Sequence, residues 1–452
     1  MLIKPSFGWV FLWLKVIIVS KSLYIKHYNI AIELVKNNRF EEAGKELTSA
    51  LGYFPNAEKA YLLKAQCLAS MGKPEFMQQA SQMVERFLVS NLDHRRAQRI
   101  WAEVNWRLAN PLWTAFYSKA LSEKRPPLPL VYDYARLLLQ AEYYSNVLRL
   151  LEKFDPNARV NEFDIMRAHV QFKTKSYEQA LKSIEKVIAS GNKSAATLRT
   201  KAKCELALKQ YQQALQSARQ LVAVSKKPEQ GDWALLASVF KAAELSDSYQ
   251  ELYDFERFVS ASFLPVPSEF STRQSFHNRL SLELEKLHGS SQHPLEQSLR
   301  NGSQTDGHLF ANSSGATQHL ATGIKEHVAQ WVSNLGKDPS HPFLQHSSKN
   351  FDFTGSWSVK LRNNGYHKSH YHNEGWISGC YYVAANKELT NKGQGWLKLG
   401  ESELLEEEYA DYFIRPEEGL IVLFPSYFWH GTTPFQSREN RLTVAFDIYP
   451  EE

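Results

Sequence analysis

A spacing of 34 residues recurs in the first half of this chain, and it constrains the fold more than any other feature of the sequence. The runs that begin at Tyr177 and at Tyr211 both carry Tyr, Ala and Leu at matching places, and an earlier copy begins at Tyr144. A small residue three places after an aromatic one lets two antiparallel helices approach, while the aromatic ring fills the groove between them. The period therefore predicts stacked helix pairs.

Weaker copies extend the pattern toward the N-terminus. The runs at Phe40 and Phe76 repeat at a spacing of 36–37 residues, and Phe76 lies twice 34 residues before Tyr144, which leaves room for one divergent unit around 101–121. This part of the chain resembles a tetratricopeptide array of six or seven units. The resemblance implies an α-solenoid whose concave face binds a protein or peptide partner, although no contact residue can be named from the sequence.

From Trp357 onward the polarity pattern changes from a helical period to alternation. Side chains two apart in a strand share one face, so alternation predicts half-buried strands. At least five short strands, separated by Gly, Asn or Pro turns, are expected within residues 357–361, 376–383, 395–400, 420–425 and 442–448. Short strands in this arrangement favour a β-sandwich or a partly open barrel.

The chain is therefore expected to be a multidomain α + β protein, and two or three domains suit its 452 residues. The expected parts are an apolar N-terminal segment (1–21), the helical solenoid (22–262), a linker with supporting helices (263–345) and a β domain (346–452). Within the linker, residues 311–336 are expected to form a short helix pair that braces the sheet.

Histidines gather in the predicted β domain. His370 and His372 stand two apart, and His430 follows an apolar run at 420–425. Their side chains can converge on one metal ion, because residues i and i+2 of a strand point to the same face. Arg441 and Thr443, also two apart, can face one cavity in the same way. Imidazoles from separate strands with a cationic anchor are suited to an iron site that also binds a dicarboxylate.

Taken together, the last third resembles the iron(II)- and 2-oxoglutarate-dependent oxygenases, and within them the prolyl-hydroxylase-like branch found fused to tetratricopeptide repeats. The resemblance is carried by the runs at residues 370–382, 395–397, 416–419, 423–431 and 441–443, with a further likeness at 293–300. It implies a double-stranded β-helix (jelly-roll) core and an oxidoreductase that uses Fe(II), 2-oxoglutarate and O₂, with ascorbate as an optional reductant.

The resemblance makes His370 the first metal ligand and His430 the last. The family's usual middle ligand is a carboxylate two residues after the first histidine, and here that place holds His372. A site with three histidines lacks one negative charge compared with the common triad. In the alternative reading, His372 and Glu374 supply the usual histidine and carboxylate, again with His430.

The same resemblance assigns residues to the cosubstrate. Arg441 would pair with the distal carboxylate of 2-oxoglutarate, since a guanidinium binds a carboxylate through two parallel hydrogen bonds. Thr443 would add a hydroxyl from the same strand face, and Tyr382 would add another unless it is a core aromatic residue. The substrate would be a protein or peptide side chain presented by the repeats, and its identity does not follow from the sequence.

Charge and cysteine content bound the remaining possibilities. Residues 1–100 carry 14 basic and 8 acidic side chains, whereas residues 351–452 carry 9 and 15. This split indicates two modules with different partners and not one nucleic-acid binder. Cys67, Cys204 and Cys380 are far apart and form no CxxC motif, which argues against a disulfide framework or zinc ribbon and indicates a reducing, cytoplasmic location.

Residues 8–19 are strongly apolar but shorter than the roughly 20 residues that cross a bilayer, and Lys15 interrupts them. A packing helix or an N-terminal extension is favoured over export or anchoring. Two other functions remain open for the whole chain. One is a three-histidine dioxygenase that does not use 2-oxoglutarate, and the other is a non-catalytic tetratricopeptide scaffold with a degenerate barrel.

Overall fold

The computed structural model describes residues 7–122, 126–156, 161–225, 227–288, 298–305, 309–311, 313–348, 350–385, 393–406 and 409–451. The chain divides into two compact units. The first holds residues 1–126 with 287–292 and 306–312, and the second holds residues 127–286 with 293–305 and 313–452. The predicted motif at 293–300 falls mostly outside the described residues, because only its last three residues, 298–300, are described.

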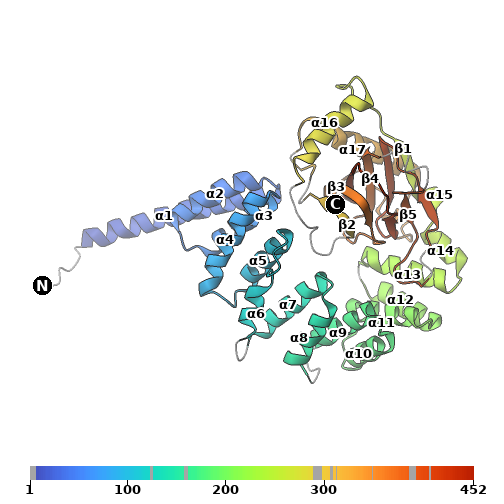
Figure 1. Cartoon of the computed structure of the whole chain (residues 1–452), viewed down its shortest axis with the longest axis horizontal. Coiled ribbons are helices and arrows are strands. Elements are labelled where there is room, and N and C mark those ends of the chain that lie inside the picture. Colours follow the sequence, from blue (N-terminus) through green and yellow to red (C-terminus); the bar gives the residue numbers. More distant parts are fainter. Residues whose placement is uncertain are drawn as a thin grey trace. The chain divides into compact units, whose positions relative to one another are not determined.

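Helices of the first unit follow one another in antiparallel pairs (Figure 1). They are α1 (Phe7–Lys36), α2 (Phe40–Tyr53), α3 (Glu58–Ser70), α4 (Pro74–Ser90), α5 (Arg95–Arg107) and α6 (Ala115–Ala120). The helix α1 includes the apolar segment at 8–19, and its later residues Tyr24, Tyr28 and Ala31 pack against α2. No helix in the described part of the chain is both long enough and apolar enough to cross a membrane.

The second unit continues the pairing and then changes to sheet. Its paired helices are α7 (Leu128–Gln140), α8 (Tyr144–Phe154), α9 (Asn161–Lys173), α10 (Tyr177–Ala189), α11 (Ala195–Ala207), α12 (Tyr211–Val224), α13 (Gln230–Ala242) and α14 (Ser246–Leu252). The remaining elements are α15 (Phe255–Phe258), β1 (Ser260–Phe263), α16 (Arg273–Glu285), β2 (Leu299–Gln304), α17 (Gly315–Leu335), η1 (Leu344–His346), β3 (Phe351–His367), β4 (Ile377–Ala384), β5 (Leu397–Leu399), β6 (Tyr412–Ile414), β7 (Leu420–Pro425), β8 (His430–Thr432) and β9 (Arg441–Pro450).

The turn inside each helix pair explains the 34-residue period. A residue with positive φ ends the first helix at Glu142, Lys175, Lys209 and Glu244, at spacings of 33 to 35 residues. The next residue's N–H then donates to a carbonyl five positions back, as in the C-cap that follows a left-handed residue. The aromatic and alanine positions follow this turn, so the predicted period marks where each pair reverses direction.

Two antiparallel sheets form the C-terminal part of the second unit. The larger has the strand order β1-β7-β4-β9-β3-β2, and the smaller has the order β6-β5-β8. Strand β9 lies at the centre of the larger sheet, where Thr443 pairs with Val359 of β3 and with Tyr382 of β4. Two strands of this sheet, β1 and β2, come from before residue 346, and the domain boundaries expected at 262 and 345 stay predictions.

The α + β fold class is confirmed: a helical repeat region precedes an antiparallel β domain. The short helix pair expected within 311–336 is wrong, because a single helix, α17, spans Gly315–Leu335. Buried residues at Ile324, Val328 and Val332 keep one apolar face along this helix, which continues through Gly323 without a break. Helix α16 packs on β4, where His277 and Tyr381 share a 2.8 Å hydrogen bond.

The first prediction concerns that contact. Burial lowers the pKa of His277 to about 4, with the nearby Arg273 adding to the effect. In the unfolded chain, His277 becomes protonated near pH 6.5, whereas in the folded chain it stays neutral until about pH 4. The contribution of the neutral, buried His277 to the unfolding free energy is therefore complete above pH 6.5 and is lost as the pH falls toward 4. When the pH is lowered from 7 to 5, we expect the unfolding free energy to fall by about 2 kcal/mol less in His277→Gln than in the wild type.

Denaturant unfolding at the two pH values measures this difference. Tyr381→Phe is the matched control, because it removes the hydrogen-bond partner and leaves the histidine in place. It should retain the wild-type acid sensitivity, and an equally steep acid loss in His277→Gln would contradict the prediction.

Candidate metal centre

Backbone pairing brings the first and last predicted histidines together. His430 opens β8 after the turn at 426–429, and His370 forms an isolated antiparallel bridge with it. The two residues exchange both backbone hydrogen bonds, with N···O distances of 2.9 and 2.8 Å. Residues directly opposite in an antiparallel pair present their side chains on the same face. The N–H of His372 then donates to the carbonyl of Ser426, which fixes the third histidine beside them.

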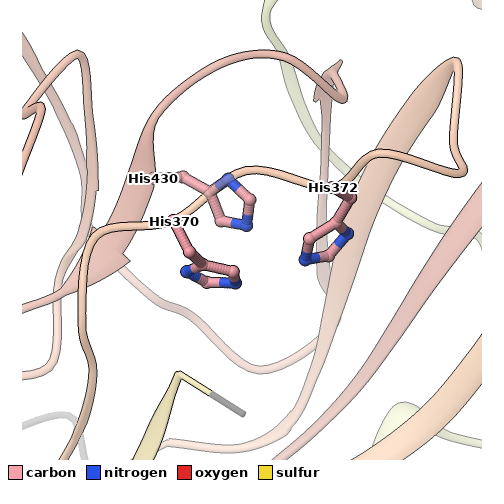
Figure 2. Close-up of side chains that lie close together, drawn as sticks. All are labelled: His370, His372 and His430. Carbon is pink, nitrogen blue, oxygen red and sulfur yellow. The ribbon is translucent and has the colours of Figure 1, made fainter. Parts of the chain in front are cut away.

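The three imidazole rings turn toward one common space (Figure 2). One nitrogen from each of His370, His372 and His430 lies within 4.8 Å of the other two. The ring centroids are 4.1 Å apart for His370 and His430, 5.1 Å for His370 and His372, and 4.9 Å for His372 and His430. The three predicted histidines are thus close together, although His370 and His372 lie on a loop and not on the strand that the i, i+2 argument assumed.

Each ring has an acceptor at Nδ1. Nδ1 of His370 lies 2.8 Å from the carbonyl of Lys368, and Nδ1 of His430 lies 2.9 Å from the carbonyl of Phe428. Nδ1 of His372 lies 2.6 Å from a carboxylate oxygen of Asp447. A carbonyl or carboxylate only accepts, so Nδ1 carries the proton and Nε2 keeps its lone pair. All three rings are therefore held in the tautomer that binds a metal through Nε2.

The surroundings of the rings favour the neutral form. Burial is the main cause that lowers the pKa of His370 to about 3, and the neighbouring His372 adds to it. Burial, followed by the charges of His370 and His372, lowers the pKa of His430 well below its ordinary value. Neutral imidazole is the form that coordinates a metal ion, so both rings stay competent as ligands in mildly acidic solution.

The carboxylate weighed as an alternative middle ligand lies elsewhere. Glu374 is exposed in the loop after His372, and its oxygens are not among the donor atoms that gather at the three rings. The described residues thus bring together three histidines and leave Glu374 apart. The identity of the middle ligand stays a prediction, and the geometry favours His372.

A second cluster surrounds the start of β9. Arg441 is 7% exposed, its Nη1 donates to the carbonyl of Gly395 at 2.6 Å, and its guanidinium lies 5.0 Å from the ring centre of Tyr382. Nε of Arg441 and the hydroxyl of Tyr382 are buried without a hydrogen-bond partner. Thr443 lies two residues along the same strand, opposite Tyr382. Within the described residues, no carboxylate pairs with this guanidinium.

Sequence reasoning missed two groups at this site. Asp447 on β9 binds His372, and Ser298 lies 3.2 Å from Nε2 of His370 and 2.9 Å from Nδ1 of His367. The signal for Asp447 was available, because it is a carboxylate in a mostly apolar strand and stands at an even spacing from Arg441. No comparable signal existed for Ser298.

Repeat helix α13 holds the loop that carries two of the histidines. The N–H of Gly231, in the first turn of α13, donates to the side-chain oxygen of Asn373 at 3.0 Å. The ring of Tyr371 lies against Gly231 and meets Trp429 edge-on at 4.9 Å. The indole N–H of Trp429 donates to Ser238 of the same helix at 3.0 Å. Residues next to all three histidines therefore contact α13.

Comparisons with known protein families agree with the division of the chain into a helical repeat region and a β domain. Residues 355–447 match the family model described as "Putative 2OG-Fe(II) oxygenase", and residues 28–75 match the model described as "Tetratricopeptide repeat". No curated protein matches the chain. The chain thus joins a region similar to tetratricopeptide repeats to a region similar to putative 2OG-Fe(II) oxygenases.

Several solved structures are similar to parts of the chain. A tetratricopeptide repeat protein from Parabacteroides merdae is 14% identical, with coverage of 52% of this chain and 91% of that one and a TM-score of 0.39. A prolyl-4-hydroxylase from Pseudomonas putida is 12% identical, with coverage of 44% and 96% and a TM-score of 0.28. HygX from Streptomyces hygroscopicus, solved with nickel, 2-oxoglutarate and hygromycin B, is 13% identical, with coverage of 44% and 86% and a TM-score of 0.29.

The second prediction tests the contact between α13 and the loop. A Cβ added at Gly231 would lie 2.5 Å from the ring of Tyr371, which is too close for any real contact. We expect Gly231→Ala to lower the unfolding free energy by about 1–3 kcal/mol, because the ring must move from a packed position. Divalent-metal affinity should fall with it, since Tyr371 stands between two of the histidines.

Gly323→Ala is the matched control, because Gly323 lies within α17 of the same unit and an added Cβ meets nothing within 4 Å. It should raise the stability slightly, as alanine generally does inside a helix. Urea unfolding and calorimetric metal titration of both variants measure the two effects. Unchanged metal affinity in Gly231→Ala would show that α13 does not position the histidines.

Proposed function

We propose that the chain is an iron(II)- and 2-oxoglutarate-dependent dioxygenase that hydroxylates a side chain of a protein or peptide. The observation that carries this proposal is the convergence of His370, His372 and His430, each with an acceptor beside Nδ1, so that Nε2 keeps the lone pair that a metal ion would use. Three neutral nitrogen ligands would hold a metal ion and would leave other coordination positions open for cosubstrate and O₂.

The residues present fit the groups that the oxygenase family implies. The three imidazoles would hold Fe(II), and the bound iron with 2-oxoglutarate supplies oxidising chemistry that splits O₂ between succinate and a hydroxylated C–H bond, with release of CO₂. Phe424 and Trp357 lie beside His430 and His372, with ring centroids 4.8 and 5.6 Å apart, and these rings limit the access of water.

Arg441 fits the distal carboxylate of 2-oxoglutarate. A buried guanidinium without an anionic partner is costly, and a dicarboxylate supplies the missing charge. The unpaired Tyr382 hydroxyl lies on the neighbouring strand and can donate to the same carboxylate, while Thr443 adds a hydroxyl on β9. Two orphaned polar groups next to each other thus share one explanation.

The repeat helices support a protein or peptide substrate. A tetratricopeptide array presents an extended concave surface, which commonly binds a peptide segment. On α11, Lys203 is half-buried with no ion-pair or hydrogen-bond partner in the described part of the chain. Burial, with the nearby Lys173, lowers the pKa of Lys203 to about 8. An acidic group on the bound peptide would pair with this ammonium.

The third prediction removes one ligand. His430→Ala should abolish iron-dependent succinate formation from 2-oxoglutarate and weaken Fe(II) binding at least tenfold, because the remaining two histidines cannot enclose the ion. The assay measures succinate and metal binding on the same preparation. His319→Ala is the control, since this half-exposed histidine of α17 lies outside the cluster. Wild-type turnover in His430→Ala would refute the proposed site.

The fourth prediction separates 2-oxoglutarate use from other three-histidine chemistry. Arg441→Gln should raise the KM for 2-oxoglutarate by roughly 10- to 100-fold, since a neutral amide replaces a charged hydrogen-bonding partner worth about 1.5–3 kcal/mol. Fe(II) affinity in the absence of 2-oxoglutarate should stay close to wild type. Oxygen consumption that is insensitive to both the substitution and the omission of 2-oxoglutarate would instead support a 2-oxoglutarate-independent dioxygenase.

A further inference from the structure

A buried carboxylate stands directly behind the middle histidine. Asp447 is 7% exposed, and its Oδ1 lies 2.6 Å from Nδ1 of His372. The hydroxyl of Ser378 donates to the same oxygen at 2.6 Å. On the main chain, Asp447 of β9 pairs with Ser378 of β4 and with Gly355 of β3, so it is fixed at the centre of the larger sheet.

In the part of the chain that the structure describes, no lysine or arginine forms an ion pair with this carboxylate. Within the described residues, His372 is its only ion-pair partner. The neighbouring groups are small and neutral: Ser378, Ser426 and Gly375, whose added Cβ would lie 3.2 Å from Asp447. Burying a carboxylate without a compensating charge is costly. A metal cation on the far side of the imidazole would supply a compensating charge.

The three predicted metal ligands carry less negative charge than the ligands of the common triad. Three neutral imidazoles provide no negative charge, whereas the common triad of two histidines and one carboxylate provides one. A carboxylate hydrogen-bonded to Nδ1 of a metal-ligating histidine makes the ring more basic and fixes its orientation. His372 is the only one of the three histidines whose Nδ1 acceptor is charged, since the other two donate to backbone carbonyls.

We propose that Asp447 is a positioning residue that supplies, through His372, the negative charge that a carboxylate ligand supplies directly in the common triad. This inference rests on the proposed metal site and concerns how that site is made electrostatically complete. The negative charge would then act on a bound metal ion through the imidazole of His372 and not by direct coordination.

Asp447→Asn isolates the charge, because the amide oxygen can still accept from Nδ1 while the negative charge is gone. We expect the affinity for Co(II), titrated into metal-free full-length protein by calorimetry, to fall 10- to 100-fold. Ser378→Ala is the matched control, since it removes a neutral hydrogen bond to the same oxygen and leaves the charge. Its affinity should fall less than threefold.

In the absence of metal, Asp447→Asn should not destabilise the protein, in contrast to its expected effect on metal affinity. Metal-free Asp447→Asn should unfold at the same temperature as the metal-free wild type or at a higher one, because an uncompensated buried carboxylate has been removed. The rise in unfolding temperature on adding Co(II) should be smaller than in the wild type. A purely structural role for Asp447 would instead lower the unfolding temperature of the metal-free protein.

A second test, in which Asp447→Asn is combined with His372→Asp, remains decisive if the single variant folds poorly. His372→Asp places a carboxylate directly at the middle position, so the charge of Asp447 becomes redundant and repels the new ligand. In that background, Asp447→Asn should leave Co(II) affinity unchanged or raise it, which reverses the sign of its effect. An equal loss of affinity in both backgrounds would overturn the inference.

The outcomes also separate this inference from the proposed function. If the wild type does not bind Co(II) or Fe(II), the metal site itself fails. If the wild type binds and Asp447→Asn binds as tightly as Ser378→Ala, the metal site stands and the role of Asp447 is refuted. The visible absorption of bound Co(II) reports in the same samples whether the ion remains at the histidines.

Discussion

The candidate site depends on one pair of backbone hydrogen bonds, those that His370 and His430 exchange. These residues are 60 positions apart, and the bridge places their side chains on one face without any help from the side chains themselves. The bond from His372 to Ser426 adds the third ring to the same framework. Main-chain pairing fixes Cα positions more firmly than long side chains can, so the rings start close together before any metal contributes.

The orientation of the three imidazole rings is set by the hydrogen bonds at their Nδ1 atoms. Carbonyls of Lys368 and Phe428 lie two residues before the histidines whose rings they hold, so these two rings are set by local chain geometry. His372 is different, because its acceptor comes from a strand 75 residues away. The middle ligand therefore depends on correct assembly of the sheet, while the other two depend mainly on their own turns.

The parts that sequence reasoning could predict were those with a period or a short spacing. The 34-residue repeat predicted the helix pairs, and the positive-φ turns at positions such as Lys175 and Lys209 now give its physical cause. The i, i+2 spacing led us to expect the convergence of His370 and His372, although these residues lie on a loop pinned to β8 and not on a regular strand. The single helix α17 was missed because an apolar face continues through a stretch that contains glycine. Long-range partners such as Asp447 could not be assigned, since strand register is set by the whole sheet.

Helices α13 and α14 of the repeat region are hydrogen-bonded to the segment that leads into the candidate metal centre. Segment 427–429 leads into His430, and its polar groups are satisfied by repeat residues: Tyr253 donates to the carbonyl of Tyr427, and Tyr427 donates to the carbonyl of Leu252, both at 2.8 Å. The indole N–H of Trp429 donates to the hydroxyl of Ser238 on α13. Removing these helices would leave several buried donors and acceptors unpaired, at about 1–3 kcal/mol each. The candidate metal centre and the last repeat helices therefore share one folded core. A movement of α13 would act directly on Tyr371 and Asn373, which contact this helix and are neighbours of the histidines in the sequence.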